Sequence, residues 1–126
     1  MAVLSIVMPF SNKRELQLAL DVLVTIDLME IPFYRLPPLY ETGVRYRREL
    51  YRSAAVPGVS ERFLSARQVF AERLGDCEDL AAYLCAQRQL EGVKARAMPI
   101  RSSVGWHIIV RHADGTIEDP SKVLGM

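Results

Sequence analysis

The chain has 126 residues, half of them hydrophobic and a quarter charged, a composition typical of one soluble globular domain with a real core. Its 16 basic and 15 acidic residues leave a net charge of +1, which excludes the bulk electrostatic attraction of nucleic-acid-binding and membrane-binding proteins. Its two cysteines are too few for a disulfide framework.

The cysteines and the apolar segments bear on the expected compartment. Cys77 and Cys85 fall on one predicted helix, where eight residues at about 1.5 Å each separate them by about 12 Å, beyond disulfide reach. This favours a reducing compartment, so we expect a cytoplasmic protein. Residues 1–10 are apolar but lack the basic residues of a secretory signal. Asp21 and Asp27 interrupt the most apolar region, which predicts that no segment spans a membrane.

The first third of the chain predicts a long helix. Residues 2–8 are expected to form a short strand or a docked arm. Asn12 and Glu15 form a capping-box pattern, and residues 16–31 then predict a mostly buried, central helix. Its apolar positions cover a broad face: Leu16, Leu18, Leu20, Val22, Leu23, Ile26 and Met29.

The segment up to residue 74 predicts a loop, a short strand and a second helix. Three prolines indicate a loop over residues 32–42, and weak alternation indicates a strand over residues 43–50. Ser60 is expected to cap a helix that runs to Leu74. Its inward-facing residues are predicted to be Phe63, Ala66, Val69, Phe70 and Leu74.

The predicted strand carries a basic cluster, which we call the rim: Arg45, Tyr46, Arg47 and Arg48, with Arg52 just beyond. One interpretation is an ordinary solvated surface, because the net charge is close to zero. The other is a rim that binds an acidic substrate or partner.

The stretch from Gly75 to Leu84 combines a loop glycine, a helix cap, a cysteine and an apolar run. Asp76 is a suitable N-cap, and Asp79 in the first turn suits the helix dipole. Cys77 takes the first helical position, where partial positive charge favours the nucleophilic thiolate. Glu91-Gly92 predicts the end of the helix. The alternative for a lone cysteine is a small buried hydrophobe.

The last part of the chain predicts an antiparallel meander. Strands are expected over residues 93–100, 106–111 and 116–119, with a loop at 101–105, and Pro120 is expected to end the sheet. Helices followed by a meander predict an α+β domain, in which a helix packs on a sheet.

The hairpin loop decides whether a histidine and an acid meet. We predict a three-residue loop, Ala113-Asp114-Gly115, with Gly115 in the left-handed region. Ile109 then faces Asp119, so that His107 and Asp119 share a face as diagonal neighbours. A two-residue loop would place them on opposite faces.

These residues carry a family resemblance. Gly-Asp-Cys-Glu-Asp-Leu-Ala at 75–81, with Trp106-His107 and Glu118-Asp119-Pro120, resembles the transglutaminase-like (papain-fold) cysteine superfamily over residues 74–120. Small bacteriophage-encoded members are similar over more of the chain, including residues 39–47 and the Asp119-Pro120-Ser121 ending. The resemblance implies a single domain over residues 1–126. A helical part, 1–74, would precede the cysteine helix and a small antiparallel sheet, 75–126.

The resemblance also implies the chemistry. Cys77 would be the nucleophile, His107 the base and acid, and Asp119 the residue that orients the imidazole. A thioester would form from a peptide or isopeptide amide, and water or an amine would then accept the acyl group. The Cys77 backbone N–H is the expected oxyanion donor. A second donor is not identified, because the nearest preceding glutamine, Gln68, lies nine residues before the cysteine and inside a predicted helix.

Each site residue has a structural alternative. His107 could be a core histidine, Asp119 a turn residue, and His112 is expected to be exposed. Glu78 and Asp79 lack the His/Cys partners of a metal site, so no metal or cofactor is expected.

Two functions follow from these observations. The first is a thiol hydrolase or acyltransferase with a peptide or protein substrate. The second is a non-catalytic phage virion or tail-assembly protein that keeps the fold and binds phage structural proteins through the rim. It would work in the bacterial host cytoplasm or in the virion. Neither function involves nucleic acid or a membrane.

Overall fold

The structure is a computed structural model, which describes residues 5–6, 12–48, 61–103 and 105–126. Within these ranges lie four α-helices, one 3-10 helix and seven strands. In chain order they are β1 (Ser5–Ile6), α1 (Lys13–Tyr34), η1 (Leu39–Glu41), β2 (Arg45–Tyr46), β3 (Glu61–Arg62), α2 (Ala66–Glu72), β4 (Leu74–Gly75), α3 (Cys77–Leu90), β5 (Ala95–Ser102), β6 (Gly105–His112), β7 (Ile117–Glu118) and α4 (Pro120–Val123). The described part is an α+β fold, as predicted. The predicted helix cap Ser60, Arg52 and most of the predicted arm at 2–8 lie outside the described residues.

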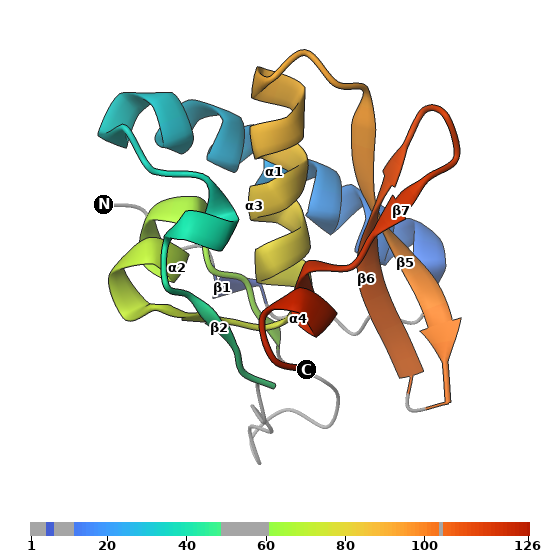
Figure 1. Cartoon of the computed structure of the whole chain (residues 1–126). Coiled ribbons are helices and arrows are strands. Elements are labelled where there is room, and N and C mark those ends of the chain that lie inside the picture. The colour runs from blue at the N-terminus through green and yellow to red at the C-terminus, as the bar shows by residue number, and fades with distance from the viewer. Residues whose placement is uncertain (1–4, 7–11, 49–60, 104) are drawn as a thin grey trace.

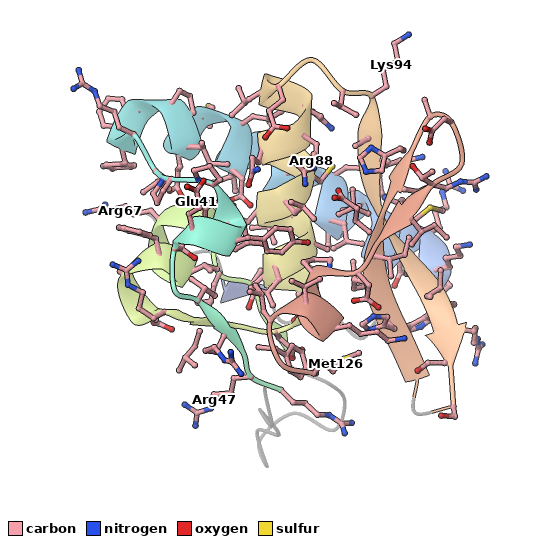
Figure 2. All side chains as sticks on the ribbon, in the orientation of Figure 1. Glu41, Arg47, Arg67, Arg88, Lys94 and Met126 are labelled. Carbon is pink, nitrogen blue, oxygen red and sulfur yellow. The ribbon has the colours of Figure 1, made fainter. Side chains whose placement is uncertain are left out.

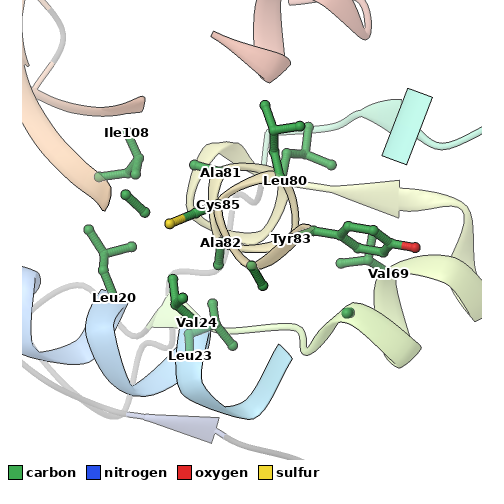
Figure 3. Close-up of a cluster of buried hydrophobic side chains, with 14 of the residues drawn as sticks. Leu20, Leu23, Val24, Val69, Leu80, Ala81, Ala82, Tyr83, Cys85 and Ile108 are labelled. Atoms are coloured by element: carbon green, nitrogen blue, oxygen red, sulfur yellow. The ribbon is translucent and has the colours of Figure 1, made fainter. Parts of the chain in front are cut away.

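Helix α3 lies at the centre of the core (Figure 1). Helices α1 and α2 pack against it, and so does the antiparallel sheet β5-β6-β7. All side chains from Leu80 to Ala86 are fully buried, so α3 has no polar face along this length. Figure 3 shows the Cys85 side chain pointing toward Ile108 of β6 and Leu20 of α1. Small residues such as Ala81 and Ala82 allow these neighbours to approach closely.

Helix α1 is longer than predicted. Asn12 caps it as expected, since its side chain accepts from the Glu15 N–H at 3.0 Å. The predicted end at Pro32 is wrong, because the helix continues through this proline to Tyr34 and ends at Arg35, a residue with φ 52°. A proline this near the C-terminal end removes one N–H donor but leaves the preceding turns intact. None of the helices among the described residues is long and apolar enough to cross a membrane.

The prediction that α1 is mostly buried is wrong for one face. Leu18, Val22 and Met29 are 60%, 49% and 63% exposed. The core contacts α1 along the opposite face, through Leu20 and Leu23 among others. Sequence periodicity could not separate these faces, because both are apolar.

Asp27, a polar residue of α1, is completely buried. Its Oδ1 accepts from the Ala66 N–H at 2.7 Å and so fixes the first residue of α2. Burial, followed by the nearby carboxylates of Glu30 and Asp79, raises the pKa of Asp27 well above its ordinary value.

We expect Asp27→Asn to flatten the pH dependence of stability. Because the folded-state pKa is raised, the stabilising contribution of Asp27 is full below its unfolded pKa of about 4 and is lost as pH rises through the folded-state pKa. The free energy of unfolding therefore falls with rising pH, by up to about 1.4 kcal/mol per pH unit from this group. Urea unfolding between pH 4 and 8 measures the slope. Asp21→Asn, at a partly exposed position of the same helix, should keep the wild-type slope of unfolding free energy against pH. An unchanged slope in Asp27→Asn would contradict the assignment.

The predicted helix from Ser60 to Leu74 is shorter at both ends. Residues 61–62 form β3, which pairs with β1, and α2 begins only after Ser65. Arg73 adopts φ 59° and ends the helix, after which β4 pairs with β2 in parallel. Phe63, Ala66 and Val69 are buried as predicted, whereas Phe70 and Leu74 are only half-buried.

The meander follows the predicted register. β6 and β7 pair Val110 with Glu118 and Arg111 with Ile117, so Ile109 lies opposite Asp119. Gly115 has φ 91°, which confirms the three-residue loop with a left-handed glycine. The predicted loop at 101–105 is mostly strand, because β5 and β6 pair from Ala95–His112 to Ser102–Gly105. Pro120 ends the sheet as expected, but it also starts α4, which the sequence analysis does not predict.

Candidate active site

The start of α3 is held by two aspartates. The Asp76 Oδ1 accepts from the Cys77 N–H at 2.7 Å, and the Asp79 Oδ2 accepts from the Asp76 N–H at 3.0 Å, which completes a capping box. The other oxygen of Asp79 accepts from the Leu64 N–H at 2.8 Å. Cys77 is thereby fixed at the first helical position, as predicted. Gly75 before it lets the chain pass close to α3, because an added Cβ would lie 2.9 Å from Leu80 Cδ2 and would force that side chain to shift.

The predicted base and its orienting acid are in contact. His107 Nε2 lies 2.8 Å from Asp119 Oδ2, and both side chains are largely buried. A carboxylate accepts hydrogen bonds, so Nε2 carries a proton, and in the neutral imidazole the lone pair is then on Nδ1. Asp119 also caps α4 by accepting from the Lys122 N–H at 3.4 Å. This cap gives the carboxylate a fixed position between β7 and α4.

Cys77 lies beside the strand that carries His107. Its sulfur is within hydrogen-bonding reach of the backbone N–H of Ile108, the residue that follows His107. Figure 1 shows the N-terminal end of α3 close to α4, with β6 beside them. Within the described ranges, the side-chain hydrogen bond of the Cys77 sulfur goes to Glu78 Oε2 at 3.3 Å and not to His107. The structure thus joins the His–Asp pair directly and brings the cysteine to the same strand.

The expectation that Cys77 favours the thiolate is wrong for this arrangement. Burial has the largest effect on the Cys77 pKa, and together with the negative charges of Glu78 and Asp76 it raises that pKa above the ordinary value of a thiol. These effects outweigh the helix N-terminus. Burial also raises the pKa of Cys85 to about 11. The raised pKa favours the neutral thiol of Cys77 over the thiolate near neutral pH.

The predicted oxyanion donor is occupied. The Cys77 N–H donates to Asp76 Oδ1, so it is not directed at an empty oxyanion position. An oxyanion could bind there only after displacing the carboxylate. The Asp76 side chain thus caps the N–H of Cys77 in addition to the third helical N–H of the capping box.

The rim lies next to the segment that leads into Cys77. Tyr46 pairs with Gly75, and the Arg47 N–H donates to the Gly75 carbonyl at 2.8 Å. Burial, followed by the negative charge of Asp76, raises the pKa of Tyr46 to about 12, and the phenol also interacts with Cys77, so this ring lies close to the site. Arg45, Arg47 and Arg48 are exposed, and Figure 2 shows Arg47 extending away from the ribbon.

A second histidine–carboxylate pair was not predicted. His112 Nε2 lies 2.9 Å from Glu118 Oε2, and Arg88 of α3 donates to the same carboxylate at 2.8 Å and 3.0 Å. His112 is half-buried, which corrects the expectation that it is exposed. This pair links α3 to the meander and contains no nucleophile.

One group of side chains has the proximity that a metal ion needs. The ligand atoms of Asp76, Cys77 and Glu78 all lie within 4.8 Å of one another. They belong to three consecutive residues at a helix start, where the capping bonds already explain the proximity of Asp76 and Cys77. We assign no metal to them.

Comparisons of the chain with protein-family models, curated proteins and solved structures find no match.

Proposed function

We propose that the protein is a thiol-dependent acyltransferase or hydrolase for peptide or isopeptide amides, of the transglutaminase-like type that its sequence resembles. The observation that carries this proposal is the bond of 2.8 Å between His107 Nε2 and Asp119 Oδ2, on the strand beside Cys77. A buried imidazole held by a carboxylate, on a strand whose backbone contacts a cysteine sulfur, supplies the base and orienting acid that acyl transfer by a thiol uses.

The proposed reaction transfers a proton as the sulfur attacks. His107 Nδ1 takes the thiol proton while a sulfur electron pair forms the bond to the amide carbonyl carbon. Asp119 stabilises the resulting imidazolium. Collapse of the tetrahedral intermediate breaks the C–N bond, and the amine leaves with the proton from His107. The thioester then reacts with water in hydrolysis or with an amine in cross-linking. Because Cys77 is a neutral thiol at rest, general-base catalysis fits this site better than a preformed thiolate.

The rim supplies the proposed contact surface for substrate. It borders the strand that precedes Cys77, and its exposed arginines favour an acidic peptide or protein segment. The proposed reaction and the proposed substrate contact involve no cofactor.

We infer one further candidate, a non-catalytic phage virion or tail-assembly protein with the same fold. The exposed apolar residues of α1 favour it, since Leu18, Met29 and Phe33 offer a surface for a protein partner. The neutral thiol and the occupied Cys77 N–H also suit a site that does no chemistry.

Mass spectrometry after incubation with a peptide-based, thiol-directed amide or aldehyde probe separates the two candidates. The enzyme should gain one adduct at Cys77, and Cys77→Ala should lose it while keeping its fold. Cys85→Ala is the matched control and should keep the adduct, because Cys85 is fully buried. An assembly protein would show no adduct. In a complementation assay it would tolerate Cys77→Ala and fail after charge reversal at Arg45, Arg47 and Arg48.

A further inference from the structure

The sulfur and the backbone N–H of Cys77 each donate a hydrogen bond to an acidic neighbour, Glu78 and Asp76 respectively. Glu78 Oε2 accepts from the Cys77 sulfur at 3.3 Å, and Asp76 Oδ1 accepts from the Cys77 N–H at 2.7 Å. Glu78 is only 3% exposed, so the bond to the sulfur is shielded from water. Electrostatic interactions in such a shielded place are stronger than at the surface.

We propose that Glu78 is a fourth residue of the site, which holds the thiol proton of Cys77 in the free protein and delays its transfer to His107. This inference rests on the proposed function, in which His107 is the base. The carboxylate stabilises the S–H form, which donates to it, and repels the thiolate. For the reaction to start, the S–H must leave Glu78 Oε2, and its proton then passes to His107 Nδ1 as the S–C bond forms. Without substrate, the cysteine is protected from alkylation and oxidation.

The groups that face the sulfur support this resting state. From α3 and its cap come Glu78 and Asp76, and from β2 comes the Tyr46 phenol, all of which interact electrostatically with Cys77. From β6 comes the Ile108 N–H, which favours the thiolate but is one neutral donor against two carboxylates. Arg48 of the rim interacts with Tyr46 and is exposed. The balance favours the neutral thiol.

The pH dependence of Cys77 alkylation tests the role of Glu78. We would measure the rate with iodoacetamide on the full chain from pH 6 to 10, with the modified site located by mass after digestion. Glu78→Gln should lower the midpoint by about one pH unit or more and raise the rate at pH 7 roughly tenfold. Glu91→Gln removes the same charge just beyond the other end of α3, about 20 Å away, and should match the wild type. If burial alone protects the thiol, the midpoint of Glu78→Gln should equal that of the wild type.

Two outcomes would overturn the role of Glu78. One is a Glu78→Gln profile that superimposes on the wild type, and the other is a wild-type Cys77 that reacts faster than a free thiol at pH 7. If Glu78→Gln does not fold by circular dichroism, Glu78→Asp takes its place, because the shorter side chain withdraws the carboxylate from the Cys77 sulfur. The inference then requires a lower midpoint in Glu78→Asp than in the wild type, and an equal or higher one contradicts it.

The amide probe separates this inference from the proposed function. A shifted midpoint without probe labelling would support the role of Glu78 and contradict the proposed enzymatic function. An unshifted midpoint with probe labelling would overturn the role of Glu78 and leave the proposed enzymatic function standing.

Discussion

Asp79→Ala is expected to lower the free energy of unfolding by about 3 kcal/mol, because a buried carboxylate that accepts two backbone N–H groups would be lost. Asp79 is 1% exposed and accepts from Leu64 and Asp76, so the substitution removes the acceptor of one buried N–H, that of Leu64, and of one part-buried N–H, that of Asp76. Urea or thermal unfolding followed by circular dichroism measures the loss. The variant should also disturb the position of Cys77, since the N-cap residue that precedes it is held by Asp79.

The matched control is Asp114→Ala. Asp114 also accepts from a backbone N–H, that of Thr116 at 2.9 Å, but it lies in an exposed hairpin loop. Its N–H partner can bond to water after the substitution, so we expect a loss of less than about 1 kcal/mol. Equal losses of unfolding free energy in the two variants would mean that burial does not increase the contribution of Asp79 to stability.

The parts of the site that could be predicted depend on local backbone chemistry. A capping aspartate before an apolar run predicts where α3 begins, and this placed Cys77 correctly. A glycine at the third position of a hairpin loop fixes the loop length, and the loop length fixes the register. The contact between His107 and Asp119 therefore follows from Gly115, a residue outside the site.

The parts that could not be predicted depend on contacts between distant segments. Periodicity shows that α1 is apolar on two faces but not which one meets the core, so Leu18 and Met29 were misplaced. Asp27, thirty-nine positions before Ala66, accepts from the Ala66 N–H at the start of α2, and nothing in residues 60–74 indicates that contact. The start itself had a local signal that was overlooked, the capping box of Ser65 and Gln68.

The thiolate expectation failed for a related reason. The helix N-terminus favours a thiolate, and that effect can be inferred from the position of Cys77 alone. The opposing effects depend on burial and on the direction of the Glu78 side chain, which bonds to the sulfur and not to solvent. An acidic residue directly after a cysteine at a helix start was the one signal in the sequence that could have indicated this.

The same hairpin register creates both histidine–carboxylate pairs. His107 with Asp119 and His112 with Glu118 are diagonal neighbours on opposite faces of β6 and β7, at 2.8 Å and 2.9 Å. The first pair belongs to the part of β6 that Cys77 contacts, because the sulfur meets the backbone N–H of Ile108, the residue after His107. The second pair is bonded to Arg88 instead. Substitutions in the second pair therefore serve as matched controls for substitutions in the proposed triad.

Asp119→Asn is expected to lower the rate of Cys77 acylation by the amide probe roughly a thousandfold or more, because the amide can hold the imidazole in the wrong tautomer. His107→Ala should cost nearly as much, since the residues of a triad act as a unit. Glu118→Gln and His112→Ala alter the equivalent pair on the other face and should stay within about threefold of the wild type, a change of less than 1 kcal/mol in the barrier. Pre-steady-state mass spectrometry measures all four rates, and unfolding curves confirm that each variant is folded. If the Glu118 and His112 variants lose as much activity as the Asp119 and His107 variants, the hairpin as a whole and not the proposed triad controls Cys77.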